Sequence, residues 1–310
     1  MDSVRKRLWA VVPLFCAVAL AACGSSNSSS PGTGSGATGT GTSAAVPSST
    51  ANAAVEKLVP SSIKSKGTIT VAADASYAPD EFIGPDGHTV VGMDADLSKA
   101  LGAVMGLKVN VVNATFSTII PGLADGHYDM GASSFTDTKA REKVVDFVDY
   151  ANVGESFYTK TSGGTSIGSI ADICGKTVSV ESGTTEQADA KTQSGKCTKA
   201  GKPGVHVLVF STQTEANLAV SSGRAQLGFA DTPVADYQVK KSGGLFKLIG
   251  TAYAPAPYGL AVPKGGFDKA VEAALKVLVS NGTYGKIFAK WGLQGIEIPA
   301  SGVKINGATS

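Results

Sequence analysis

The chain has 310 residues, of which 43% are hydrophobic and 17% are charged, with 38 glycines and a formal net charge of +2. This length gives room for two compact domains with hydrophobic cores and excludes a single small disulfide-stabilised scaffold, while the composition excludes wholesale disorder. Nucleic-acid binding requires a cluster of basic side chains, and no Lys/Arg-rich block follows residue 7. We therefore expect no nucleic-acid partner.

Residues 1–22 form a predicted lipoprotein signal peptide. Arg5, Lys6 and Arg7 make a cationic start, and the apolar run over residues 8–19 is too short to span a bilayer. The run ends in Leu-Ala-Ala-Cys23, which looks like a bacterial lipobox, whose cysteine thiol receives a lipid. The alternative is ordinary cleavage after Ala-x-Ala beside a chance cysteine. With lipidation at Cys23, the protein is exported and anchored to the outer face of the cell membrane, and the remaining chain has equal numbers of acidic and basic side chains.

A tether follows the predicted cleavage site. No charged side chain occurs between residues 24 and 55, and Ser, Gly, Thr and Ala dominate. Such a segment cannot bury enough apolar surface to offset the entropy of ordering it. Residues 23–60 are therefore predicted to be the lipidated cysteine and a flexible linker.

Two cysteines, Cys174 and Cys197, remain once Cys16 leaves with the signal and Cys23 carries lipid. In an exported protein this pair predicts one disulfide that closes a loop of about 23 residues. Two unpaired buried thiols are the alternative.

The first part of the body alternates strands with helices. Strands are expected over 68–72 and 108–112, and a helix over 94–105, with Asp94 as its N-cap and Leu97, Leu101 and Val104 on one face. A helix carrying Ile119 then leads to a strand over 128–132. This βαβ pattern favours a mostly parallel sheet covered by helices.

The same pattern restarts after a Ser/Gly-rich stretch at 161–168. The sequence predicts strands over 176–180, 205–210 and 226–230, with helices over 186–191, 214–220 and 233–240. A last strand over 258–263 and a helical pattern over 267–291, broken near 281–282, are the candidates to return to the first domain. A second α/β domain is thus expected inside the first.

No catalytic or metal-binding pattern is visible. The histidines His88, His127 and His206 are scattered, and none has a ligand-like partner three or four residues on. The chain has no nucleophile elbow, phosphate loop or dinucleotide fingerprint after a strand. We therefore expect no cofactor, no metal and no enzymatic activity.

Several motifs resemble one family of transport proteins. They are Asp74-Ala-Ser-Tyr77-Ala-Pro79, Gly92-Met-Asp94-Ala-Asp96-Leu97, FSTIIPGL at 116–123, SSFTDTKAR at 133–141, Val145-Asp146-Phe147 and Asn281-Gly282-Thr283-Tyr284. In this order and spacing, over about residues 67–292, the chain resembles the polar amino-acid-binding family of ABC-importer solute-binding proteins, extracellular solute-binding family 3.

The resemblance implies an α/β, two-lobed, type II periplasmic-binding-protein-like fold, with two crossing strands near 157–160 and 254–259. Lobe 1 would comprise residues 61–157 and 257–296, lobe 2 residues 158–256, and residues 297–310 a C-terminal tail. Ligand would sit between the lobes, which close by hinge bending.

The resemblance also implies a ligand-binding set. Arg141 matches the arginine that grips the ligand α-carboxylate, for which a planar guanidinium is suited; pairing with Glu142 or Asp137 on the surface is the alternative. Asp231 matches the acid that pairs with the α-ammonium, or else caps the helix at Pro233. The set is completed by Asp74, Tyr77, Phe116, Ser133, Ser134, Thr136, Glu181, Thr184 and Thr185.

Alternatives remain open for several members of this set. Tyr77 and Phe116 match aromatic residues on the two ligand walls but could simply pack in the core. Ser133, Ser134 and Thr136 match a loop that cradles the ligand but could cap a helix. Thr184 and Thr185 open a helix whose free amides can receive a carboxylate.

Two positions depart from the family pattern. Asp80 stands where relatives commonly have an aromatic residue, which puts the usual apolar clamp in doubt. Glu181 occupies a position that in relatives faces the ligand side chain, and a carboxylate there favours a cationic or amide side chain over an acidic one.

The resemblance implies a monomer that delivers a polar amino acid to ABC permease subunits. Two alternatives use the same architecture: a cyclohexadienyl-dehydratase-like enzyme, and a sensory or adhesive lipoprotein without a transport role.

Overall fold

The computed structural model describes residues 49–309, so the predicted signal peptide, Cys23 and most of the tether lie outside the described residues. No helix within this range is long and apolar enough to cross a membrane. The helices are α1 (Ala53–Glu56), α2 (Ser61–Lys66), α3 (Met93–Val104), α4 (Phe116–Ala124), α5 (Thr185–Lys199), α6 (Gln213–Ser221), α7 (Thr232–Lys241), α8 (Phe267–Ser280) and α9 (Thr283–Trp291). Single 3-10 turns are η1 (Arg141–Lys143), η2 (Ile170–Ile173), η3 (Gln294–Ile296) and η4 (Ala300–Gly302).

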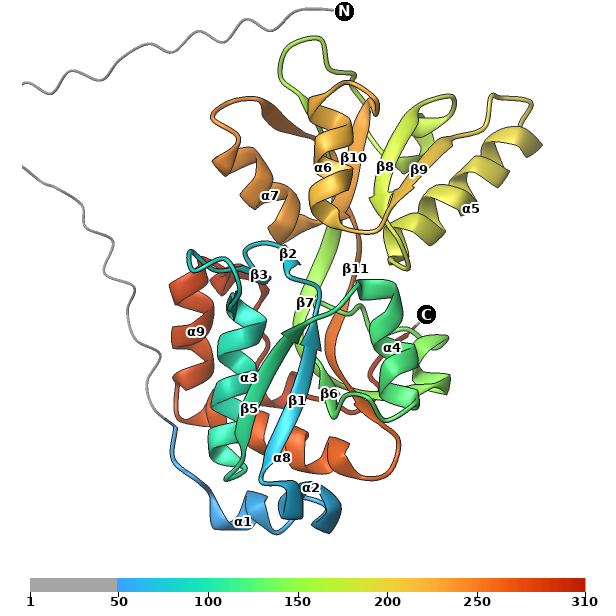
Figure 1. The fold of residues 1–310 in the computed structure, drawn as a ribbon. Coiled ribbons are helices and arrows are strands. Elements are labelled where there is room, and N and C mark those ends of the chain that lie inside the picture. The colour runs from blue at the N-terminus through green and yellow to red at the C-terminus, as the bar shows by residue number, and fades with distance from the viewer. Residues whose placement is uncertain (1–48, 310) are drawn as a thin grey trace, which may run out of the picture. The chain divides into compact units, whose positions relative to one another are not determined.

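An eight-stranded mixed sheet organises the described residues (Figure 1). Its strands are β1 (Thr68–Ala73), β5 (Lys108–Asn113), β6 (Met130–Gly131), β7 (Val145–Lys160), β8 (Thr177–Glu181), β9 (His206–Phe210), β10 (Leu227–Asp231) and β11 (Phe246–Pro263). They lie in the order β5-β1-β6-β11-β7-β10-β8-β9. A separate three-stranded sheet contains β2 (Ser76–Tyr77), β3 (Glu81–Ile83) and β4 (Val90–Val91).

The two longest strands, β7 and β11, join the two halves of the large sheet. They pair with each other antiparallel, while the strands on either side, β5-β1-β6 and β10-β8-β9, pair parallel among themselves. The register between β7 and β11 shifts between Ile249 and Tyr253 and again between Tyr253 and Ala256. The irregular stretch therefore overlaps the expected crossing at 254–259, whereas residues 157–160 lie farther along β7. We call the parts of the sheet on the two sides of this stretch the β1 half and the β10 half.

Helices cover both faces of the β1 half. On one face, Ile69 and Val71 of β1 pack in a cluster with Leu97 and Leu101 of α3 and with residues of α8 and α9. On the other face, Ala72 packs with residues of α4. The alternation along β1 follows from the two-residue period of a strand. Figure 1 shows α3 and α9 on one side of β1 and α4 on the other.

The β10 half is covered in the same way. Ala230 packs with α6 and α7, while Leu227 and Phe229 pack in a second cluster with Val178 of β8 and Ile173 of η2. All five residues of β10 are buried, as expected for a strand inside a covered sheet. The α/β, two-sided architecture predicted from the sequence is confirmed.

Some local predictions are wrong. The strand expected over 128–132 contains only Met130–Gly131, and the helix expected to end at 191 continues to Lys199. Asp94 is not an N-cap: Gly92 holds that position with φ 133°, and a Cβ there would collide with the carbonyl oxygen of Asp80. The side chain of Asp94 instead accepts a hydrogen bond from the amide of Ser134 at 2.9 Å.

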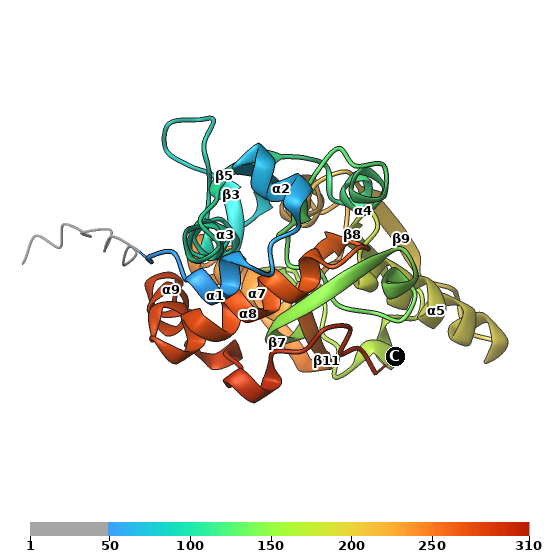
Figure 2. The same cartoon turned by 90° about the horizontal axis from the view of Figure 1, so that it is seen from below.

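The folded body begins before residue 61. Val55 of α1 and Val59 are 3% and 6% exposed and belong to the cluster of α3 and α8, and the Asn52 amide donates to the Val104 carbonyl at 2.9 Å. Figure 2 shows α1 beside α8. These two valines anchor the segment before residue 61 to the cluster of α3 and α8.

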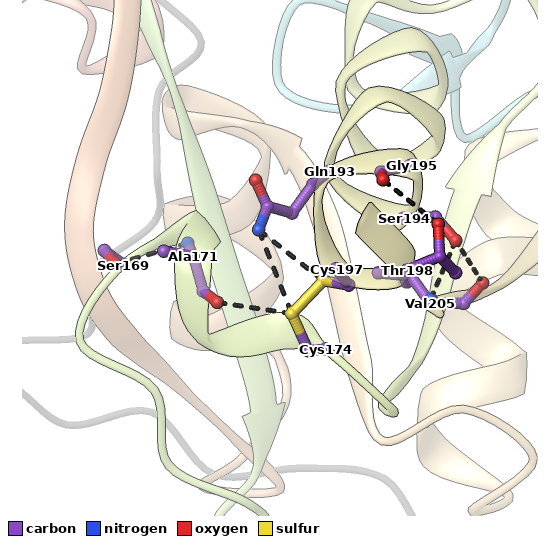
Figure 3. Close-up of a disulfide and its surroundings, with 9 residues drawn as sticks. All are labelled: Ser169, Ala171, Cys174, Gln193, Ser194, Gly195, Cys197, Thr198 and Val205. Atoms are coloured by element: carbon purple, nitrogen blue, oxygen red, sulfur yellow. Dashed lines mark hydrogen bonds between the residues drawn. A yellow bond between two sulfur atoms is a disulfide. The ribbon is translucent and has the colours of Figure 1, made fainter. Parts of the chain in front are cut away.

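The predicted Cys174–Cys197 disulfide is present (Figure 3). It connects the residue after η2 to the last turn of α5, with a Cα–Cα distance of 5.6 Å. Gln193, one turn earlier on α5, points its amide nitrogen at the Cys197 sulfur, 3.6 Å away. The bridge therefore fixes α5 against the loop that leads into β8.

Candidate functional site

One cavity collects the predicted ligand-binding residues. It has about 270 Å³ of space not filled by atoms, part of it open solvent, and takes side chains from both halves of the sheet. We call it the inner cavity. It is lined by Asp74, Tyr77, Glu81, Phe116, Ser133, Ser134, Thr136, Arg141, Glu181, Thr184, Thr185, Glu186 and Asp231. Every residue expected to contact a ligand is in this lining, together with Glu81 and Glu186, which the sequence analysis missed.

Arg141 lies in η1, and its guanidinium contacts two aromatic rings, which stack on each other, and two backbone carbonyls. Its carbon Cζ is 5.5 Å from the ring centre of Phe116 and 5.7 Å from that of Phe135. The guanidinium donates to the carbonyl of Thr136 at 2.7 Å and to that of Gly183 at 2.9 Å. Burial lowers the pKa of Arg141 below its usual value, but a guanidinium keeps its charge in proteins.

The expected alternative for Arg141 is not observed. No carboxylate lies within 4.0 Å of its guanidinium among residues 49–309, and Glu142 pairs instead with Lys139 at 2.9 Å. Because a guanidinium has five N–H donors and two are used by carbonyls, donors remain for an anion. This geometry suits a carboxylate lying over the Phe116 side of the cavity.

Asp231 and Tyr77 meet across the cavity. The Tyr77 hydroxyl donates to Asp231 Oδ2 at 2.9 Å and accepts from the Asp231 amide at 3.0 Å. Asp231 stands at the N-cap position of α7, but its side chain makes no capping bond. Burial raises the pKa of the Asp231 carboxyl to about 6. The carboxylate is thus turned into the cavity rather than onto the helix.

The loop after β6 places hydroxyls next to acids. The Ser133 hydroxyl donates to Glu81 Oε1 at 3.0 Å, and the Ser134 hydroxyl donates to Asp80 Oδ2 at 3.0 Å. Ser134 adopts φ 49°, in the left-handed region, where a serine is uncommon. No helix begins at these serines, so they do not act as caps.

The first turn of α5 forms the opposite wall. Thr184 is the N-cap, and its hydroxyl accepts from the Gln187 amide at 3.2 Å. Thr185 contacts Thr136 from the other half of the sheet, with 3.3 Å between their hydroxyl oxygens. The helix has 15 residues, so its N-terminus carries a partial positive charge beside the cavity.

Acidic side chains dominate the lining. Glu181 and Glu186 are both 2% exposed, and each has one oxygen without a hydrogen-bond partner among the described residues. Burial raises the pKa of both groups well above the usual value, with a further contribution from Asp74 at Glu181 and from Asp231 at Glu186. The lining contains five carboxyl groups and one guanidinium, so its electrostatics favour a ligand that carries positive charge.

Asp80 lies behind the cavity rather than in it. Its side chain is fully buried against Ser134, and burial together with the charge of Asp94 raises its pKa well above the usual value. The signal for the two missed residues was present in the sequence: Glu81 follows Asp80 directly, and Glu186 follows Thr184-Thr185.

Comparisons with known proteins agree on one family. Residues 69–294 match the family of bacterial extracellular solute-binding proteins, family 3. The chain is 33% identical to the arginine-binding protein ArgT of Corynebacterium glutamicum over 242 residues, which cover 77% of this chain and 79% of that protein. It is 28% identical to the ABC transporter glutamine-binding protein GlnH of Bacillus subtilis, over 91% of this chain and 95% of that protein.

Solved structures give the same result. An ancestral arginine-binding protein bound to arginine matches with a TM-score of 0.67 and 34% identity, over 73% of this chain and 98% of that one.

Proposed function

The chain belongs to family 3 of the bacterial extracellular solute-binding proteins, and on that premise we propose that it captures an amino acid with a cationic side chain, arginine being the first candidate. The observation that carries the proposal is the lining of the inner cavity, in which five carboxyl groups face one guanidinium. An amino acid supplies one carboxylate for the guanidinium, and a cationic side chain adds a second positive group to the α-ammonium.

We assign the two ends of the ligand from the geometry of the cavity. The α-carboxylate binds Arg141, whose free donors lie beside Phe116. The α-ammonium binds Asp231, and the side chain extends toward Glu181, whose buried oxygen lacks a partner among the described residues. A guanidinium or ammonium there satisfies a carboxylate that would otherwise be buried alone.

The proposal includes two lobes that close on the ligand. Lobe 1 comprises residues 61–157 and 257–296, and lobe 2 residues 158–256, with the hinge in β7 and β11. The irregular register near Tyr253 supports this, because unmatched pairing there leaves the two strands freer to bend. A ligand that touches Arg141 and Asp231 at once would favour the closed form.

We further propose that the protein is a monomer that delivers its ligand to an ABC permease and is held to the membrane by lipid on Cys23. It acts as a carrier rather than an enzyme. Incubation with arogenate or prephenate tests the last point, since formation of the dehydrated product would contradict it.

Calorimetric titration with the twenty amino acids tests the ligand class. We expect tight binding of arginine or lysine, weaker binding of glutamine, and none of glutamate or aspartate. Tight binding of glutamate or aspartate, with none of arginine, lysine or glutamine, would refute the proposal.

A further inference from the structure

A second, wider pocket adjoins the inner cavity, with which it shares part of its lining. It has about 1220 Å³ of space not filled by atoms, part of it open solvent, and shares Thr136, Arg141, Thr184 and Thr185 with the inner cavity. We call it the outer pocket. Its remaining lining consists of Asp137, Thr138, Ala140, Glu155, Gly183, Ala188, Asp189, Ala254, Pro255, Ala256, Pro257 and Thr309.

Glu155 of β7 is the buried acid of this pocket. It is 4% exposed, and its Oε2 has no hydrogen-bond partner among residues 49–309. It stands directly opposite Asp231 in the β7–β10 ladder and opposite Tyr253 in the β7–β11 ladder. Like charges facing each other across strands are destabilising. A positively charged partner at the Glu155 carboxyl would relieve the repulsion.

Two more acids face the same space. Asp137 is 1% exposed, and its Oδ1 has no partner within the described part of the chain, while its Oδ2 accepts from the Ala308 amide at 3.1 Å. Asp189, on the second turn of α5, is half-buried. Arg141 supplies the positive charge of the lining, but its guanidinium bonds to carbonyls and forms no ion pair with these acids among residues 49–309.

The remaining lining combines short apolar side chains with threonine hydroxyls. The apolar part includes Ala188 of α5 and residues 254–257 of β11, which contribute two alanines and two prolines. The hydroxyls come from Thr136, Thr138, Thr184, Thr185 and Thr309. No group of acids, histidines or cysteines in the described residues is arranged to hold a metal ion. Acids beside small apolar side chains fit an organic cation with a short alkyl stem.

We propose that the outer pocket is a second binding site, which takes a small alkyl-ammonium or alkyl-guanidinium ion with its charged head at Glu155. The site does not depend on which amino acid fills the inner cavity. Its walls belong to α5 and to both long strands, so an occupant contacts the hinge directly.

The protonation of Glu155 gives the site a pH signature. Burial and the charges of Asp231 and Asp189 raise the pKa of Glu155 to about 9, although the Thr185 hydroxyl and Arg141 lower it. Glu186 and Tyr253 are the other titratable groups that face Glu155. A cation stabilises the ionised carboxylate, so binding releases a proton. Affinity for the cation should therefore increase from pH 6 toward pH 9.

The test is an NMR titration of ¹⁵N-labelled protein with n-butylammonium chloride. We expect saturable shifts at the amides of Ala188, Asp189 and Ala254, but not with n-butanol or with sodium chloride at the same ionic strength. Glu155→Gln should weaken binding by about tenfold or more and remove the pH dependence. Glu272→Gln, an acid of α8 paired with Lys276, is the matched control and should bind as the unaltered protein does.

Three results would overturn the site. These are equal shifts with n-butanol, shifts confined to inner-cavity amides such as Ser134 and Glu181, or unchanged affinity in Glu155→Gln. If Glu155→Gln does not fold, Asp189→Asn replaces it, and unchanged affinity in that variant refutes the site equally. None of these results depends on the inner-cavity ligand, which the amino-acid titration tests separately.

Discussion

Replacing Arg141 by alanine is the sharpest test of how the inner cavity holds its ligand. Two charge-assisted hydrogen bonds to an α-carboxylate would be lost, at about 1.5–3 kcal/mol each. We therefore expect a loss of about 3–5 kcal/mol, which corresponds to roughly a 150-fold to 5,000-fold higher Kd. Calorimetric titration with arginine measures this directly.

A second ligand separates this effect from general damage to the cavity. Agmatine is arginine without the α-carboxylate, so it cannot use Arg141. The unaltered protein should bind arginine more tightly than agmatine by about the same factor, and Arg141→Ala should bind the two with similar affinity. If Arg141→Ala retains the full preference for arginine, the assignment of the α-carboxylate to Arg141 is wrong.

The matched control is Arg224→Ala. Arg224 also lies over an aromatic ring, with Cζ 5.5 Å from the ring centre of Phe210, but it is not in the lining of the inner cavity. Losing this stacked guanidinium should leave arginine binding unchanged.

Three further outcomes follow from the structure. Glu181→Gln should weaken binding of arginine and lysine by about tenfold or more, with little change for glutamine; a uniform loss across all three in the same calorimetric series would contradict a side-chain role. Replacing Cys174 and Cys197 by serine should lower the free energy of unfolding by about 3 kcal/mol and Tm by roughly 5–10 °C, because the bridge closes a 23-residue separation. Arginine binding should be retained, because the bridge is far from the first turn of α5. Calorimetric melting that shows no change in Tm would refute the prediction. Burial raises the pKa of Asp231 to about 6 and that of Asp149 to about 8, so both groups take up protons on folding. Their contribution to stability is complete below the ordinary pKa of 3.8 and is lost as pH rises through 6 and 8. Urea unfolding of the unliganded protein should therefore give a lower free energy of unfolding at pH 9 than at pH 5. The reverse trend would contradict the two raised pKa values.

Local patterns in the sequence predicted most of the helices and strands, and the residues that the family resemblance implied lie together in the lining of one cavity. The βαβ order could be predicted because the residue pattern of each strand and helix is recognisable over five to twelve residues. The residues of the lining were indicated by whole motifs that resemble those of family 3, and only Asp231 was also argued from its place at the end of a strand. These features depend on short stretches of chain, which a single sequence displays well.

The remainder depends on partners distant in the sequence. β7 and β11 pair across about a hundred residues, and their lengths are set by that pairing rather than by local pattern. Tyr77 lies in the lining of the inner cavity, but nothing in the sequence indicated that its hydroxyl donates to Asp231, 154 residues away. No sequence pattern indicated that Glu155 is buried, because its burial results from the position of β7 between β10 and β11.

Among residues 49–309, few hydrogen bonds join the two walls of the inner cavity. Tyr77 donates to Asp231, Arg141 to the Gly183 carbonyl, and Thr136 meets Thr185. Neutral bonds of this kind contribute about 1 kcal/mol each and bonds to a charged group somewhat more. These hydrogen bonds are opposed by the free-energy cost of burying several carboxyl groups close together. Either bound protons or bound cations must offset that cost. A ligand with two positive groups offsets it directly, whereas an amide side chain leaves a carboxylate unpaired. With the proposed closure, the balance between open and closed forms should therefore depend on ligand charge more than on ligand size, and the proposed selectivity for cationic side chains would follow from closure itself.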